Sequence, residues 1–161
     1  MPPPGRRMQL ESPYRISRSY AQHLNAPPAD VFPLLCPVRE LEWVEGWDPG
    51  VVITDSGIAE LGCVFTTRAG DAEAIWTITE YEPDDGRIAF LKVTPGQTVA
   101  DISVKLEPDG DGKSVAHVTY AHTALGPGGR SIVDEFTEAH FDAFMQGWEA
   151  ALNAYLARQG S

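Results

Sequence analysis

Between residues 51 and 125 the sequence consists of short apolar segments at regular spacing. Turn clusters such as PDDG, TPG and PDGDG separate several of these segments. Connections this short cannot hold the crossover that parallel strands need. We therefore predict an antiparallel meander of six strands, in the segments VVITDS, ELGCVFTTRA, AEAIWTITEYEP, RIAFLKVTP, QTVADISVKLEP and SVAHVTYAHTAL.

The flanking segments complete the order of elements. YRISRSYAQHLNA predicts a first strand, and PPADVFPLL and PVRELEWVEGWDPG then predict two short helices, the second of them a helix or a turn. Residues 131–158 contain no proline and predict one long helix. The expected fold is α+β, with a curved antiparallel sheet of about seven strands whose concave face packs on the last helix. Such packing often leaves a cavity.

Length and composition bound the possible functions. A chain of 161 residues with 43% hydrophobic residues is typical of one soluble domain. We expect that domain at residues 14–161, after a mobile, proline-rich lead-in at residues 1–13. The net charge of -11 would repel a nucleic acid backbone, so no nucleic acid partner is expected. No segment has the length of a membrane span, and we expect a cytoplasmic protein.

Cysteine usage and catalytic motifs are uninformative. Cys36 and Cys63 lack metal-binding spacing and are expected to be reduced, buried thiols. The sequence contains neither a serine nucleophile motif nor a phosphate-binding loop. We therefore expect no metal and no cofactor, and assign no catalytic residue.

Three stretches carry a family resemblance: LNAPPADVFPLL, YEPDDGRIAF and the long final helix. Through them the chain, from Tyr14 to Arg158, resembles the helix-grip superfamily. This superfamily includes START-type lipid-transfer domains, the birch-pollen-allergen family and bacterial polyketide cyclase/dehydrase-like proteins of the SRPBCC group. PVRELEWVEGWDP and ELGCVFTT resemble a subset of the bacterial members. The resemblance implies a START-like domain whose hydrophobic pocket binds a small apolar or amphipathic molecule, sometimes with catalysis.

A helical projection identifies the face of the last helix that should meet the sheet. His140 lies in the middle of that face, as a polar anchor for a ligand or as a hydrogen-bonded core histidine. Tyr120 and His122 share one side of their strand and are predicted to point toward His140, if that side faces the helix. The predicted face comprises Val133, Phe136, His140, Ala143, Phe144, Gly147 and Ala151.

The bulky aromatic residues are further pocket candidates, although core packing is the commoner role of such residues and the simpler explanation of each of them. Trp43 and Trp47 are the better candidates, because they are four residues apart in the second short helix, which the family resemblance places near the mouth of the cavity. Arg39 and Glu40 beside them are expected to form an ion pair at the surface or rim. The complete predicted ligand-binding set is His140, Phe136, Phe144, Tyr120, His122, Trp76, Phe65, Trp43 and Trp47.

Three functions remain open at this point. The first is non-covalent binding of a small hydrophobic or amphipathic ligand. The second is a cofactor-independent cyclase or lyase for an aromatic or polyketide-like substrate, in which His140 or His122 moves a proton and Tyr120 polarises a carbonyl. The third is an interaction module that binds apolar segments of a partner protein. The sequence also leaves open whether the chain is a monomer or a homodimer.

Overall fold

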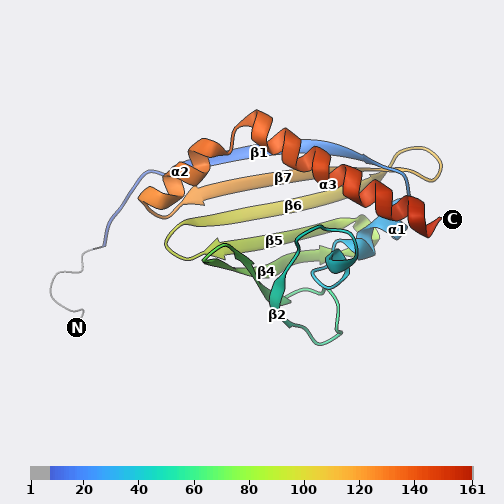
Figure 1. Ribbon diagram of the computed structural model, residues 1–161, viewed down its shortest axis with the longest axis horizontal. Coiled ribbons are helices and arrows are strands. Elements are labelled where there is room, and N and C mark those ends of the chain that lie inside the picture. Colours follow the sequence, from blue (N-terminus) through green and yellow to red (C-terminus); the bar gives the residue numbers. More distant parts are fainter. Residues whose placement is uncertain (1–7, 161) are drawn as a thin grey trace.

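The computed structural model describes residues 8–160 and is built on one seven-stranded antiparallel sheet (Figure 1). From β2 to β7 each strand pairs with the next along the chain, and β1 pairs with β7, giving the order β1-β7-β6-β5-β4-β3-β2. The predicted antiparallel meander is therefore confirmed. The strands are β1 (Arg15–Leu24), β2 (Pro49–Ile53), β3 (Val64–Ala69), β4 (Ala72–Glu82), β5 (Arg87–Thr94), β6 (Thr98–Pro108) and β7 (Ser114–Ala124).

Of the predicted lead-in, residues 1–7 lie outside the described residues. Residues 8–13 are exposed and form no regular secondary structure. Within residues 8–160, no helix combines the length and the apolar composition that crossing a bilayer requires.

The connection from β1 to β2 contains the short helices predicted after the first strand. They are α1 (Pro28–Val31), the 3-10 helix η1 (Phe32–Leu34) and the 3-10 helix η2 (Arg39–Glu42). Proline occupies the first turn of both α1 and η1, where its missing N–H costs no helical hydrogen bond. One further 3-10 turn, η3 (Pro83–Asp85), joins β4 to β5.

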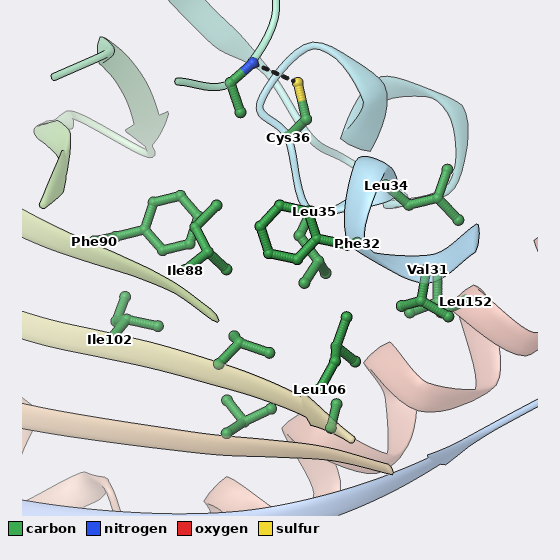
Figure 2. Close-up of a cluster of buried hydrophobic side chains, with 14 of the residues drawn as sticks. Val31, Phe32, Leu34, Leu35, Cys36, Ile88, Phe90, Ile102, Leu106 and Leu152 are labelled. Carbon is green, nitrogen blue, oxygen red and sulfur yellow. Dashed lines mark hydrogen bonds between the residues drawn. The ribbon is translucent and has the colours of Figure 1, made fainter. Parts of the chain in front are cut away.

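The main core lies between the concave face of the sheet and the α1–η1 segment (Figure 2). In β6, alternate residues from Thr98 to Leu106 are buried and those between them are more exposed, which identifies the concave face. Cys36 and Cys63 are free and buried, as predicted. The side chains labelled in Figure 2 come from both sides of this core: Val31, Phe32, Leu34, Leu35, Cys36, Ile88, Phe90, Ile102, Leu106 and Leu152.

The C-terminal region is divided into two helices, α2 (Pro127–Glu135) and α3 (Glu138–Gln159). Phe136 leaves the helical conformation (φ -83°, ψ 62°), and the side chain of Thr137 caps α3 by accepting from the backbone N–H of His140. The guanidinium of Arg18 donates to the Phe136 carbonyl at 2.8 Å, satisfying a group that the helix end leaves free. The prediction of one uninterrupted helix over residues 131–158 is wrong at this junction.

The junction also corrects the predicted helix face. The residues that α3 buries are Phe141, Met145, Leu152 and Tyr155, whereas His140 and Phe144 are exposed. His140 is therefore not in the middle of the buried face. The projection assumed one continuous helix from Val133. Because Phe136 is not helical, the residues of α3 do not continue the rotation of α2 about the helix axis. The buried face therefore contains Phe141 and Met145, each one residue after the predicted His140 and Phe144.

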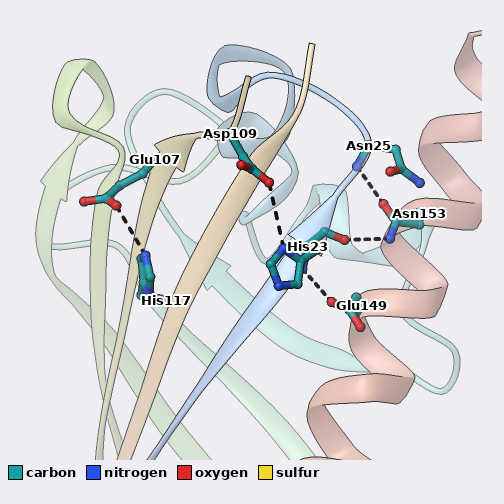
Figure 3. A network of polar contacts seen from close by, with 7 residues as sticks. All are labelled: His23, Asn25, Glu107, Asp109, His117, Glu149 and Asn153. Carbon is teal, nitrogen blue, oxygen red and sulfur yellow. Dashed lines mark hydrogen bonds and ion pairs between the residues drawn. The ribbon is translucent and has the colours of Figure 1, made fainter. Parts of the chain in front are cut away.

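Polar contacts with the end of β1 hold α3 in place (Figure 3). The backbone N–H of His23 donates to the Glu149 carboxylate, and that of Asn25 donates to the Asn153 side chain at 2.9 Å. Asn153 in turn donates to the His23 carbonyl at 3.0 Å. The buried Gln22 side chain donates to the Met145 carbonyl at 3.1 Å. Helix α3 thus runs along β1 (Figure 1) and leaves part of the concave face of the more distant strands uncovered by α3.

The burial of α3 predicts different costs for two neighbouring truncations. Met145 is 0% exposed and Phe144 is 51% exposed. Met145→Ala should lower the free energy of unfolding by about 2–5 kcal/mol, because it opens a void in the core. Phe144→Ala should cost less than about 1 kcal/mol. Urea denaturation of both variants measures the difference, and an equal or larger loss for Phe144→Ala would contradict the observed helix face.

Candidate functional site

A cavity of about 490 Å³ lies between the concave face of the sheet, α3 and the loop at residues 44–48. Its walls come from β3 to β7, from Phe136 at the helix junction and from the exposed edge of α3. The position of α3 along β1 is what leaves this part of the concave face open. Most of the lining side chains are apolar or aromatic.

Eight of the nine predicted ligand-binding residues line this cavity: Trp47, Phe65, Trp76, Tyr120, His122, Phe136, His140 and Phe144. Trp43 is not among the lining residues. It is 6% exposed, donates its indole N–H to the Leu34 carbonyl at 3.0 Å, and stacks on Trp148 with ring centroids 5.8 Å apart. Trp43 therefore belongs to the core, and Trp148, which the sequence analysis did not select, lines the cavity in its place.

One end of the cavity is an aromatic wall. Phe65 and Trp76 are directly paired across β3 and β4 and stack with centroids 5.3 Å apart and planes 17° apart. Trp47 meets both rings edge-on, at 6.2 and 6.1 Å, and Phe90 does the same at 6.3 and 6.1 Å. These rings offer flat faces and edges to a ligand that enters the cavity.

The other end of the cavity is formed by Phe136 and the polar side chains around it. The Phe136 ring lies 4.4 Å from His122, 6.2 Å from Tyr120 and 6.0 Å from His140, centroid to centroid. The helix break places Phe136 there, because a helical residue at this position would follow the course of α2. Tyr120, His122 and His140 thus line one cavity, although the exposed His140 lies at its edge rather than in its depth.

His122 and Tyr120 are polar groups in an apolar setting. Burial, and secondarily the positive charge of Lys92, lowers the pKa of His122 to about 4, so the imidazole is neutral near pH 7. Its two ring nitrogens are buried and have no hydrogen-bond partner in the described residues. Burial, followed by the neighbouring Glu40 carboxyl, raises the pKa of Tyr120, which keeps its hydroxyl proton.

Glu40 is a functional candidate that the sequence analysis misassigned. The predicted Arg39–Glu40 ion pair is absent: Arg39 pairs instead with Glu42, with 2.5 Å between Nε and Oε2. Glu40 turns into the cavity, where burial raises its pKa to about 8. Its carboxyl is therefore mostly protonated at neutral pH and can donate a hydrogen bond.

Lys92 is the second missed candidate. It lines the cavity, and its ammonium group lies 4.9 Å from the centroid of the Trp76 ring. Burial lowers the pKa of Lys92. A sequence signal existed for this residue, because alternation in RIAFLKVTP places Lys92 on the same face as the buried Ile88 and Phe90. Within the described residues, no group of three or more His, Cys, Asp or Glu side chains is arranged to hold a metal ion.

The raised pKa of Glu40 predicts a pH-dependent stability. Between its ordinary pKa and about 8 the folded chain retains a proton that the unfolded chain has released, so this group destabilises the fold as pH rises. Glu40→Gln should therefore gain stability relative to wild type between pH 5 and pH 8. The gain should be at least roughly 1 kcal/mol, since one pKa unit corresponds to about 1.4 kcal/mol and solvent screens part of the shift.

Urea denaturation at each pH measures this difference. Glu45→Gln is the matched control, because it removes an exposed carboxylate from the same segment, and it should follow the wild-type pH dependence. A constant difference between Glu40→Gln and wild type across this range would contradict the burial of the Glu40 carboxyl.

Comparison with solved structures shows the same fold in proteins of low sequence identity. A point mutant of norcoclaurine synthase from Thalictrum flavum, in complex with a transition-state analogue, superposes with a TM-score of 0.71 at 11% identity, covering 94% of this chain and 100% of that one. The Mll3558 protein from Rhizobium loti gives 0.61 at 17% identity, covering 90% and 99%. Ara h 8.0201 gives 0.63 at 16% identity, covering 89% and 99%. Identities this low establish the fold alone.

Sequence comparison identifies the family. No curated protein matches the chain. Residues 15–156 match the family described as polyketide cyclase / dehydrase and lipid transport. This match spans all seven strands and most of α3, in agreement with the helix-grip resemblance found in the sequence. The chain therefore belongs to the polyketide cyclase/dehydrase and lipid transport family.

Proposed function

We propose that this protein binds a small, largely apolar molecule non-covalently in the cavity between its sheet and α3. The observation that carries the proposal is the cavity itself, whose volume of about 490 Å³ is within the range of small-molecule sites, roughly 300–1,000 Å³. Sites of this kind combine apolar walls with a few placed polar groups. The aromatic wall and the few polar side chains around Tyr120 fit that description.

The two ends of the cavity suggest how a ligand would lie. An aromatic or alkyl body would pack against Phe65 and Trp76, where it makes the largest apolar contact. A polar group would point toward Tyr120 and toward His122, whose two ring nitrogens have no hydrogen-bond partner among the described residues. The lipid transport named in the family description supports this proposal, as does a solved structure of norcoclaurine synthase in complex with two aromatic molecules, dopamine and hydroxybenzaldehyde.

A cavity-filling variant tests this function. Val44 lines the cavity, so Val44→Phe should occupy part of its volume and weaken binding of the neutral fluorescent dye N-phenylnaphthylamine at least about tenfold, or 1.4 kcal/mol. Val51→Phe makes the same change at a 54% exposed position of the edge strand β2 and should bind like wild type. Fluorescence titration measures both affinities, with circular dichroism to verify folding. A folded wild-type protein that does not bind the dye would contradict the proposal.

One observation favours a second candidate function, cofactor-independent proton transfer on a carbonyl substrate. Glu40, with a pKa near 8, is placed close enough to Tyr120 for its charge to affect that hydroxyl. A general base is most effective when its pKa lies near the working pH. Glu40 would accept a proton from the carbon next to the carbonyl group of the substrate. Tyr120 would donate a hydrogen bond to the carbonyl oxygen. His122, with a pKa of about 4, is too weak a base for the role that the sequence suggested.

Exchange of the α-protons of β-tetralone in deuterated water tests this second candidate. Wild type should accelerate exchange over buffer, and Glu40→Gln should lower that acceleration by about 100-fold, the effect of losing one general base. Tyr81→Phe is the control, because Tyr81 is partly buried but does not line the cavity. Proton NMR measures the rates. Exchange no faster than in buffer, in a protein that binds β-tetralone, would exclude this activity while leaving ligand binding intact.

A further inference from the structure

The strand register places four side chains in one row on the concave face. Trp76 of β4 pairs with Lys92 of β5, Lys92 with Ala100 of β6, and Ala100 with His122 of β7. Adjacent strands lie about 4.8 Å apart, so Lys92 and His122 are about 10 Å apart at the backbone. Only the methyl group of Ala100 stands between them. The two side chains stand on the same face of the sheet, and the charge of Lys92 is near enough to lower the pKa of His122.

Lys92 carries a charge that its surroundings do not neutralise. In the described part of the chain its ammonium group contacts the Trp76 ring but forms no hydrogen bond or ion pair. Glu45 and Asp48 also line the cavity, yet burial alone accounts for the lowered pKa of Lys92. A charge held in an apolar wall is costly unless an opposite charge accompanies it.

Three other polar side chains of the cavity, those of His122, Tyr120 and Glu40, can donate hydrogen bonds to a ligand. Neutral His122 presents one N–H and one bare nitrogen, and neither has a partner in the described residues. The hydroxyl of Tyr120 and the protonated carboxyl of Glu40 are also donors. The lining contains two cationic side chains, Lys92 and Arg68. Arg68 is paired with Glu73 at 4.0 Å, so within the described residues Lys92 is the lining cation without an ionic partner. A ligand that complements this lining would carry acceptors and a negative charge.

We infer that Lys92 and His122 form a subsite for a carboxylate head group, on a ligand whose apolar body lies against Phe65 and Trp76. This inference rests on the proposed binding function and specifies its ligand class. The carboxylate oxygens would accept from the Lys92 ammonium and from the His122 N–H, which relieves both the unpaired charge and the unsatisfied imidazole. The acid can be aromatic or a fatty acid, since both present the same head group.

Matched pairs of competitors test the subsite. Bound N-phenylnaphthylamine is displaced with β-naphthoate or β-naphthamide, and separately with decanoate or decanamide. Each pair shares one body and differs in charge. Wild type should bind the acid of at least one pair ten times or more tighter than its amide, and the preferred pair tells an aromatic body from an alkyl one.

Two variants assign the preference to its residues. Lys92→Met should reduce the acid-to-amide preference to about one while the amide binds as before. His122→Phe keeps a ring against Phe136 and should lower the preference several-fold. Lys113→Met is the control for net charge, since it removes an exposed lysine from the turn after β6 and should retain the wild-type preference.

The outcomes separate the subsite from the binding function. Amides and acids that bind wild type equally would overturn the subsite while the cavity remains a binding site. A preference that persists in Lys92→Met would overturn the role of Lys92. A wild-type protein that binds neither the dye nor any competitor would overturn the proposed function, and with it the subsite.

Discussion

A seven-stranded curved sheet has more apolar concave surface than one helix can cover, and the rest of the structure depends on how this mismatch is resolved. Helix α3 is held along the β1 edge by Gln22, Asn25 and Asn153. The α1–η1 segment and the residue that follows it cover one end of the sheet with Val31, Phe32 and Leu35. The remaining concave surface, on β3 to β7, becomes the wall of the cavity.

The junction between α2 and α3 connects this packing to the candidate site. Arg18 and Thr137 stabilise the break by satisfying backbone groups on its two sides. Because of the break, the Phe136 ring packs against His122 and Tyr120. In a continuous helix the Phe136 side chain would point in a different direction. The same break turns the buried face of α3 toward Met145 and leaves His140 at the edge of the cavity.

The polar residues of the candidate site do not form a recognisable motif in the sequence. Glu40, Lys92, Tyr120 and His122 come from three separate regions of the chain, and no short motif joins them. Each is ordinary in its own segment. Their altered pKa values arise mainly from burial, with smaller effects of Glu40 on Tyr120 and of Lys92 on His122. Such chemistry is a product of the shared cavity.

The sequence by itself determined the antiparallel sheet, because strand periodicity and turn residues act over a few residues and leave a local signal. The alternation that places Tyr120 and His122 on one side was visible in it, and the same alternation could have selected Lys92. The sequence could not show that Glu40 turns inward, since one turn of 3-10 helix is too short for its phase to be determined. Nor could it show the break at Phe136, which depends on a hydrogen bond from Arg18, 118 residues away. Only the tertiary structure decided which residues meet in the cavity, because that depends on how helices and strands distant in sequence pack together.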